Sequence, residues 1–459
     1  RKSTIMSSLA LAVDAAPWLL ACGTTAAAAA RYGTLRLPYA AVRGDWDTCR
    51  SCAQAARITY GWPRLARSLG LMCTMRVGDR ARVQVPRIRV RPDSYGVVVD
   101  ARTIPGVGLI EWQRVARHLA DAWGAVRVSV DQVAPGRIRV RAVRRDPLLC
   151  RSVYAPDPAT LGAPDDLRTL PIGADEYAQP VSLRLDGVPG IGIYGLPGYG
   201  KTSLINSVIV RLAPSPAVQL VILDGKADDP REGDYAGVAP RATILAGDDL
   251  EESADILAGL VEHRRARSRS ISTILGHRNA WEAGFSRDWP LIVTIIDEAH
   301  TYFSQVKATG DKIKKRNESA AFNALHVEDL IKKGRSVGMI TILATQKGTG
   351  DAIPTQIRDV CPVSISFACR TSEAAVAALG EDIRRYPDAS PVALQDPAYI
   401  GVASMVVPGR PGYTRVRMPY VPDRVTTAVA QRHRDLVLTP GSLPAVPIAR
   451  SLPTQEDPS

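Results

Sequence analysis

The residues Gly195-Leu-Pro-Gly-Tyr-Gly-Lys-Thr202 decide the fold of this 459-residue chain. They match the pattern GxxxxGK(S/T) and lie between a short apolar stretch, Gly190–Tyr194, and a stretch with helical spacing, Lys201–Leu212. A strand, a glycine-rich loop and a helix in this order are the setting of a phosphate-binding P-loop. The sequence therefore predicts an α/β protein that binds a nucleoside triphosphate.

The loop supplies the groups that ATP binding requires. Its glycines let backbone N–H groups approach phosphate oxygens, and the N-terminus of the following helix adds its positive dipole end. Lys201 is expected to reach the β- and γ-phosphates, and Thr202 to ligate Mg²⁺. The predicted ATP-binding residues are Gly195, Leu196, Pro197, Gly198, Tyr199, Gly200, Lys201, Thr202 and Ser203.

Two acids follow a second apolar stretch. Leu291–Ile296 has the composition of a central parallel strand and ends in Asp297 and Glu298. Asp297 is predicted to hold Mg²⁺ through water, and Glu298 to orient and deprotonate the attacking water. A simple switch GTPase does not usually carry this glutamate, so the pair favours a hydrolysing motor ATPase.

A polar pair, Thr345-Gln346, ends a third apolar strand. Ligands of open α/β sheets bind at the carboxyl ends of the strands, so Gln346 is expected near the γ-phosphate, where it can sense the loss of that group. Glu298 and Gln346 are therefore candidate catalytic residues.

Composition and periodicity divide the chain into five segments. From about residue 181 strands alternate with helices, which predicts a parallel sheet covered on both faces. The predicted segments are an apolar N-terminal segment with a basic flank (1–50), a small Arg-rich α/β domain (70–150), a linker (151–180), a P-loop ATPase motor (181–425) and a helix with a disordered tail (426–459).

Charge is unevenly distributed along the chain. Residues 1–150 contain 24 Arg and Lys against 10 Asp and Glu, whereas residues 151–459 contain 34 against 36. A basic segment suits nucleic acid or the anionic inner face of a membrane, although biased codon usage is another explanation. Arg137, Arg139 and Arg141 alternate along a predicted strand, on a face that contacts either solvent or a polyanion.

The first residues leave two interpretations open. Residues 5–30 carry one charge, Asp14, and Arg31, Arg36 and Arg43 follow them as positive-inside flanks would. The uncharged part, 15–30, is shorter than the roughly 20 residues of a spanning helix. Both a membrane helix and an Ala-rich soluble helix remain. A membrane helix would place the protein at the cytoplasmic face of the cell membrane.

The motifs and the residues between them, from about Leu183 to Val421, resemble the FtsK/SpoIIIE family of DNA translocases. Beyond the P-loop and Asp297-Glu298, the resemblance includes Ile222-Leu-Asp-Gly-Lys226, Gly334-Arg-Ser-Val-Gly338, Leu343-Ala-Thr-Gln-Lys347, Ile357-Arg-Asp-Val-Cys-Pro362 and Ser364-Ile-Ser-Phe367. It implies a RecA-like motor fold, ATP and Mg²⁺ as cofactors, a homo-hexameric ring and double-stranded DNA in the central channel.

The layout is most similar to the conjugation translocases of actinobacterial plasmids and integrative elements. An Arg-rich module that ends in Arg144-Arg-Asp-Pro-Leu148 precedes the motor. Only 38 residues follow Val421, too few for the winged helix of many members, so we do not expect sequence-directed translocation. A ring motor also implies an arginine that reaches a neighbour's γ-phosphate. The candidates are Arg335, Arg358 and Arg370, of which Arg370 is favoured.

Two other functions compete with a duplex DNA translocase. One is a coupling-type ATPase that feeds single-stranded DNA or protein to a secretion channel. The other is a nucleotide switch or scaffold that pumps nothing. Glu298 and Gln346 argue against a passive switch. An aromatic content of 5% leaves little stacking surface for single strands, which argues against the first.

Overall fold

The computed structural model describes residues 45–77, 80–346, 352–410 and 412–439. The chain forms two compact units, Arg1–Pro147 (the small unit) and Leu148–Ser459 (the large unit). The apolar segment 5–30 and the tail after Thr439 lie outside the described residues. In the described ranges, no helix is both long enough and apolar enough to cross a membrane.

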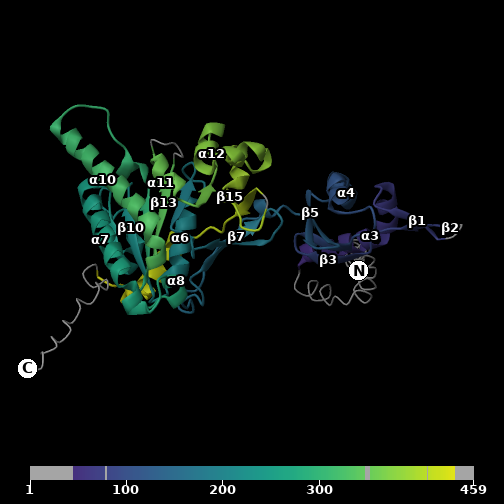
Figure 1. Ribbon diagram of the computed structural model, residues 1–459, viewed down its shortest axis with the longest axis horizontal. Coiled ribbons are helices and arrows are strands. Elements are labelled where there is room, and N and C mark those ends of the chain that lie inside the picture. Colours follow the sequence, from purple (N-terminus) through teal and green to yellow (C-terminus); the bar gives the residue numbers. More distant parts are fainter. Residues whose placement is uncertain (1–44, 78–79, 347–351, 411, 440–459) are drawn as a thin grey trace, which may run out of the picture. The chain divides into compact units, whose positions relative to one another are not determined.

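The small unit is an antiparallel sheet in the order β3-β4-β6-β5, with helices packed on one face (Figure 1). Alternation along the strands places Val99 and Val140 against Trp62 and Trp112, whose rings stack 5.2 Å apart. Its elements are α3 (Trp46–Ser68), β1 (Cys73–Val77), β2 (Arg80–Gln84), β3 (Ile88–Asp93), β4 (Gly96–Arg102), α4 (Leu109–Arg114), α5 (Ala116–Trp123), β5 (Arg127–Ala134) and β6 (Arg137–Val143).

Two stretches of this unit that have a regular sequence pattern are divided in the structure. Residues 83–90 alternate like one strand but are split between β2 and β3, because Pro86 lacks the N–H that a ladder requires. The carbonyl of Pro86 instead accepts a hydrogen bond from the Trp62 indole at 2.7 Å. Residues 110–123 have helical spacing but break at Val115 into α4 and α5. β5 and β6 pair as a hairpin around Pro135-Gly136.

The large unit is built on a ten-stranded sheet in the order β11-β10-β12-β13-β9-β14-β15-β16-β7-β8. The first six strands are parallel, as predicted, and the remaining four extend the sheet in antiparallel pairs. The strands are β7 (Thr169–Asp175), β8 (Pro180–Arg184), β9 (Gly190–Tyr194), β10 (Val218–Asp224), β11 (Ala242–Ala246), β12 (Leu291–Asp297), β13 (Met339–Thr345), β14 (Val363–Ser366), β15 (Val402–Val406) and β16 (Tyr413–Arg417).

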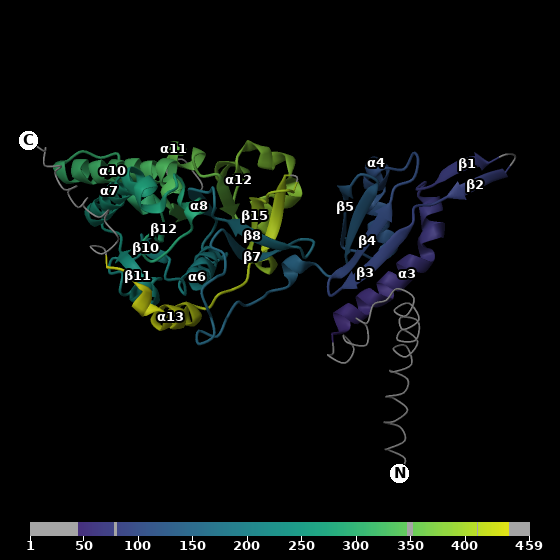
Figure 2. The same cartoon turned by 60° about the horizontal axis from the view of Figure 1, so that its bottom comes forward.

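Helices cover both faces of this sheet (Figure 2). On one face Leu204 and Ile205 of α6 pack against alternate strand residues, and on the other Leu260 and Leu330 of the long helices do so. The helices are α6 (Lys201–Leu212), α7 (Leu250–Leu275), α8 (Ala280–Ala283), α9 (His300–Phe303), α10 (Asp311–Gly334), α11 (Thr355–Asp359), α12 (Ser372–Leu379) and α13 (Asp423–Arg432).

The prediction of a linker over 151–180 is wrong for much of that range. The segment belongs to the large unit, and β7 pairs with both β8 and β16. Gly173 has φ +156°, and a Cβ there would lie 2.1 Å from the carbonyl oxygen of Arg417. Two of the residues that indicated a linker, Pro171 and Gly173, therefore belong to a bulged strand near the edge of the sheet.

Candidate nucleotide-binding and hydrolysis site

The P-loop leaves the sheet at β9, between β13 and β14, and leads directly into α6. Gly195, Gly198 and Gly200 have φ values of +144°, +77° and +117°, which L side chains rarely adopt. A Cβ on Gly195 would lie 2.6 Å from Cβ of Phe367. Gly200 is the N-cap of α6, so it caps no N–H with a side chain, and the first turn can donate to phosphate oxygens.

Lys201 is folded over this loop. Its Nζ donates to the carbonyl oxygens of Gly195 at 2.6 Å and Leu196 at 3.2 Å. Burial lowers its pKa to about 8, and the carboxylates of Glu298 and Asp297 offset part of that shift. An anion in the loop would relieve the cost of this buried ammonium, which suits a phosphate ligand.

Asp297 lies at the end of β12, in register with Asp224 at the end of β10. Its Oδ2 accepts hydrogen bonds from Lys226 Nζ at 3.0 Å and from the Tyr235 hydroxyl at 3.1 Å. Burial would lower the pKa of Lys226, but Asp297 and Asp234 outweigh it and raise that pKa. The buried acid thus has a permanent cation beside it.

Glu298 is held from two sides. Its Oε2 accepts from Gln346 Nε2 at 2.9 Å, and its Oε1 lies 2.8 Å from His300 Nδ1. Its backbone is strained, with φ +49°, and its N–H donates to Asp297 Oδ1 at 2.9 Å. Only 3% of Glu298 is exposed, so the strand end and its neighbours fix the direction of this carboxylate.

A pocket of about 950 Å³ lies against the P-loop. Lys201, Thr202, Lys226 and Gln346 line one part of it. The volume lies in the range of about 300–1,000 Å³ typical of small-molecule sites. Helix N–H groups, a lysine and hard oxygen ligands form a donor set that fits a nucleoside triphosphate with Mg²⁺.

The rest of the pocket wall comes from segments without a recognisable motif. Tyr420 N donates to Ser152 O at 2.8 Å, and Tyr154 N donates to Tyr420 O at 2.9 Å. Ser203 Oγ accepts from Val421 N at 2.9 Å and so ties this wall to α6. Further lining residues are Arg151, Val153, Met418, Pro419, Thr426 and Thr427.

Eight of the nine predicted P-loop residues divide into two groups, and the ninth, Gly195, accepts from Lys201 through its carbonyl. The pocket is lined by Pro197, Gly198, Gly200, Lys201, Thr202 and Ser203. Leu196 packs against a small cluster that includes Leu148, and Tyr199 donates its hydroxyl to Gln395 O at 2.6 Å. The side chains of Leu196 and Tyr199 therefore anchor the loop. These two residues can contact a ligand only through their backbone groups.

The three candidate arginines differ in their surroundings. Arg358 donates to Ala377 O and Thr355 Oγ1, which makes it a brace for α11 and α12. Arg335 is exposed in a 3₁₀ turn, with its carbonyl bonded to Trp281. Arg370 is exposed just after β14, two residues beyond Ala368, whose carbonyl accepts from Leu196 of the P-loop. Of the three, Arg370 is joined most directly to the P-loop edge.

Sequence patterns missed four contributors to this site. They are the contact of Lys226 with Asp297, the Tyr235 hydroxyl, His300 beside Glu298, and the wall around Tyr420. Lys226 was part of a recognised motif, but its partner lies on another strand. Only the nearness of His300 to Glu298 in sequence could have indicated its place.

Five cations lie at and before the start of α10: Lys307, Lys312, Lys314, Lys315 and Arg316. Lys315 binds Glu251 at 2.8 Å, and Arg316 donates to Ser304 O at 2.7 Å, so these two have partners within the unit. Lys307, Lys312 and Lys314 are exposed.

Comparison with known proteins identifies relatives of the chain. The DNA translocase FtsK 2 of Ralstonia nicotianae is 26% identical over 311 residues, which cover 62% of this chain and 38% of that protein. The DNA translocase FtsK of Pseudomonas aeruginosa is 24% identical over 326 residues, which cover 62% and 37%. No protein-family model matches the chain. The match thus spans little more than a third of these relatives' own length.

Among solved structures, the fold is similar to the monomer form of the pCW3 conjugation coupling protein TcpA with ATPγS. The TM-score is 0.51 at 14% identity, over 81% of this chain and 96% of that one, and this likeness concerns the fold alone. The resemblance inferred from the motifs is confirmed by the translocase relatives. The chain has the P-loop and the acidic strand end typical of ATPases, and its sequence is related to that of the FtsK/SpoIIIE type of DNA translocase.

Proposed function

We propose that the chain is an ATP-dependent double-stranded DNA translocase with a RecA-like motor that works as a homo-hexameric ring. The observation that carries the proposal is the Glu298–Gln346 hydrogen bond beside Asp297 and the P-loop. A protein that only binds nucleotide has no need of a carboxylate aimed in this way. The named activity of the sequence relatives supplies DNA as the substrate of the motor.

The residues of the chain suggest how hydrolysis proceeds. Glu298 accepts a proton from the attacking water, while Gln346 orients the carboxylate and can respond when the γ-phosphate leaves. Lys201 moves from the loop carbonyls to the phosphates, and Thr202 with Asp297 would hold Mg²⁺. When bound, the metal neutralises the charge that develops on the phosphates. Arg370 is proposed to act on the site of a neighbouring subunit.

Conjugative transfer at the cytoplasmic face of the cell membrane is the proposed setting. The order of an Arg-rich module followed by a motor supports conjugative transfer. The apolar residues 5–30 and their basic flank support membrane association. Among the residues that the structure describes, none bears on this anchor.

ATP hydrolysis without DNA, with single-stranded DNA and with duplex DNA tests the proposal. We expect duplex of unrelated sequences to raise the rate several-fold and single strands to raise it little. Stimulation by single strands alone would favour the coupling-type ATPase instead. A rate indifferent to all DNA would contradict translocation.

A further inference from the structure

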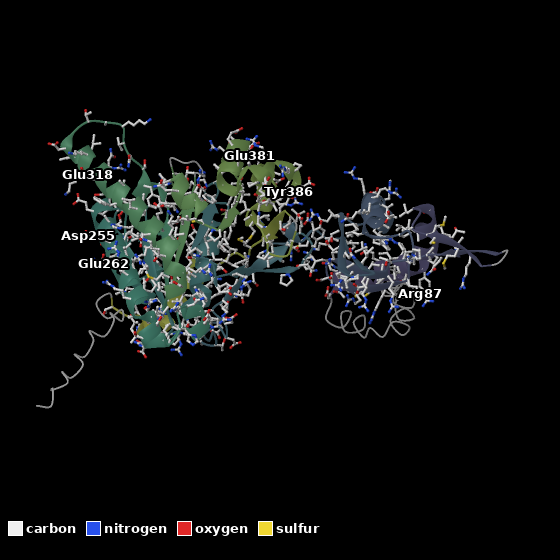
Figure 3. The ribbon with its side chains drawn as sticks, viewed as in Figure 1. Arg87, Asp255, Glu262, Glu318, Glu381 and Tyr386 are labelled. Carbon is white, nitrogen blue, oxygen red and sulfur yellow. The ribbon has the colours of Figure 1, made fainter. Side chains whose placement is uncertain are left out.

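Three arginines lie in register across the sheet of the small unit. Arg102 of β4 is paired with Arg137 of β6, and Arg102 N donates to the carbonyl of Arg87, directly before β3, at 3.2 Å. All three residues are exposed, and Arg87 can be located at the surface in Figure 3. We call these residues the arginine row.

The arginine row points away from the helices that cover the sheet. Ala101 and Ile138, adjacent in sequence to Arg102 and Arg137, are buried in the core with α3 and α5. Successive side chains of a strand point to opposite faces, so the arginines share the open face. Neighbouring strands are about 4.8 Å apart, and the row therefore spans about 10 Å.

The next row on the same face is different. It alternates in sign, in the order Arg89, Asp100, Arg139 and Asp131. Asp100 binds Arg139 at 2.8 Å and Arg91 at 2.5 Å. Like charges directly opposite each other destabilise a strand pair, whereas opposite charges stabilise it. The two positive and two negative charges of this row balance, whereas the arginine row contains three positive charges and no negative one.

No acid of the described residues forms an ion pair with Arg87, Arg102 or Arg137. Three adjacent guanidinium groups without a counter-charge among the described residues can together take an anionic ligand. A planar guanidinium donates two parallel hydrogen bonds to phosphate oxygens, which an ammonium cannot do.

We infer that the arginine row binds the phosphate backbone of the duplex DNA that the motor moves, an inference that rests on the proposed function. Each DNA strand carries one phosphate per 3.4 Å of axis, so a row of about 10 Å faces about three phosphates. Such contacts hold the duplex without reading base sequence, which suits a motor that must pass over any sequence.

Two other polyanions fit the open face less well. Its three rows contain two apolar residues, Val98 and Ala134, whereas binding to a membrane surface needs large apolar side chains that enter the lipid. The rows contain no aromatic residue on which the bases of a single strand could stack. A charged face with little apolar and no aromatic surface favours a duplex.

The test compares two variants of the whole chain that lose the same charge. In the first, Arg87, Arg102 and Arg137 are changed to Gln. In the control, the exposed Arg64, Arg114 and Arg117 of the helical face are changed to Gln. Duplex binding is measured as a function of salt, with ATPase alongside. Vesicles containing phosphatidylserine are a second probe.

The first variant should bind duplex at least tenfold more weakly near 100 mM salt. Its log–log salt slope should be smaller by about 2–3, because each lost phosphate contact removes about 0.9. Its ATPase rate without DNA should be unchanged, and the control should bind like wild type. Equal weakening of both variants, or no weakening, overturns the inference and leaves the proposed function standing.

Two further outcomes also decide against the inference. If the first variant loses vesicle binding and keeps duplex binding, the open face is a membrane surface. If the wild-type chain binds no duplex, the inference and the proposed function fail together. The two failures are thus distinguished by the wild-type measurement.

Discussion

The side-chain amide of Gln346 donates a hydrogen bond of 2.9 Å to the carboxylate of Glu298, from the end of one parallel strand to the end of its neighbour. The backbone N–H of Gln346 also points at this carboxylate, at 3.3 Å. If Gln346 loses a contact with a phosphate, its hydrogen bond to Glu298 can change as well. The geometry therefore links the proposed base to the proposed sensor.

Replacement of Glu298 by Gln keeps the size of the side chain and its contact with Gln346, but removes the base. We expect kcat to fall about 10²–10⁴-fold while ATP binding persists, because general base catalysis typically contributes that much. Single-turnover hydrolysis and nucleotide-binding titrations measure the two effects. Loss of ATP binding in a folded variant would mean that Glu298 is structural.

Replacement of Lys201 by Ala should abolish ATP turnover and leave the apo protein at least as stable as wild type. Burial of the ammonium disfavours its charged form, so its removal relieves a cost of folding. Thermal unfolding without ATP measures the stability of the apo variant. Thermal unfolding with ATP measures binding, since the ATP-induced rise in Tm should disappear. Wild-type turnover by this variant would refute the phosphate-binding role.

Arg370 is proposed to complete a neighbour's site, which mixed rings can reveal. Arg370→Ala alone and Lys201→Ala alone should each be inactive. In mixtures, a Lys201→Ala subunit still offers Arg370 to an intact P-loop next to it, so part of the activity should return. Arg335→Ala is the matched control and should stay active. Absence of recovery in rings that assemble normally would exclude Arg370 as the arginine in trans.

His263 on α7 predicts a pH dependence of stability. Burial, with Arg267 adding to it, lowers its pKa from 6.5 to about 4. Between these values the unfolded chain binds more protons than the folded one, so stability falls as pH drops from about 6.5 to about 4. The His263 contribution is at most about 3 kcal/mol.

Urea unfolding of the wild type and of His263→Gln from pH 7.5 to 4.5 checks this. The variant should lose less stability on acidification than the wild type. If stability falls with pH in parallel for the two proteins, His263 has the same pKa in the folded and the unfolded chain and the prediction is wrong.

The parallel core of the large unit followed from sequence because its signals are local. The strand ends at Tyr194, Asp297 and Thr345 are each marked by an apolar run that stops at polar residues, and parallel topology brings such ends to one edge. The P-loop, which follows one of these strand ends, then marks this edge of the sheet as the nucleotide site. This is why Lys201, Thr202, Asp297, Glu298 and Gln346 could be grouped without coordinates.

The remainder depends on contacts between distant segments. The wall at Tyr420 forms because residues near 152 pair with it across the unit, and the Pro- and Gly-rich composition of 151–180 hid that pairing. Tyr235 reaches Asp297 from a turn with no periodic pattern.

The central claim is movement along duplex DNA driven by ATP, and displacement of a third strand from a triplex measures it most directly. The wild-type chain should release the third strand only with hydrolysable ATP, from duplexes of unrelated sequence. Glu298→Gln should bind the same substrate and release nothing. If wild-type protein hydrolyses ATP on duplex DNA yet leaves the third strand in place, or if Glu298→Gln displaces it equally well, ATP hydrolysis does not drive translocation and the account is contradicted.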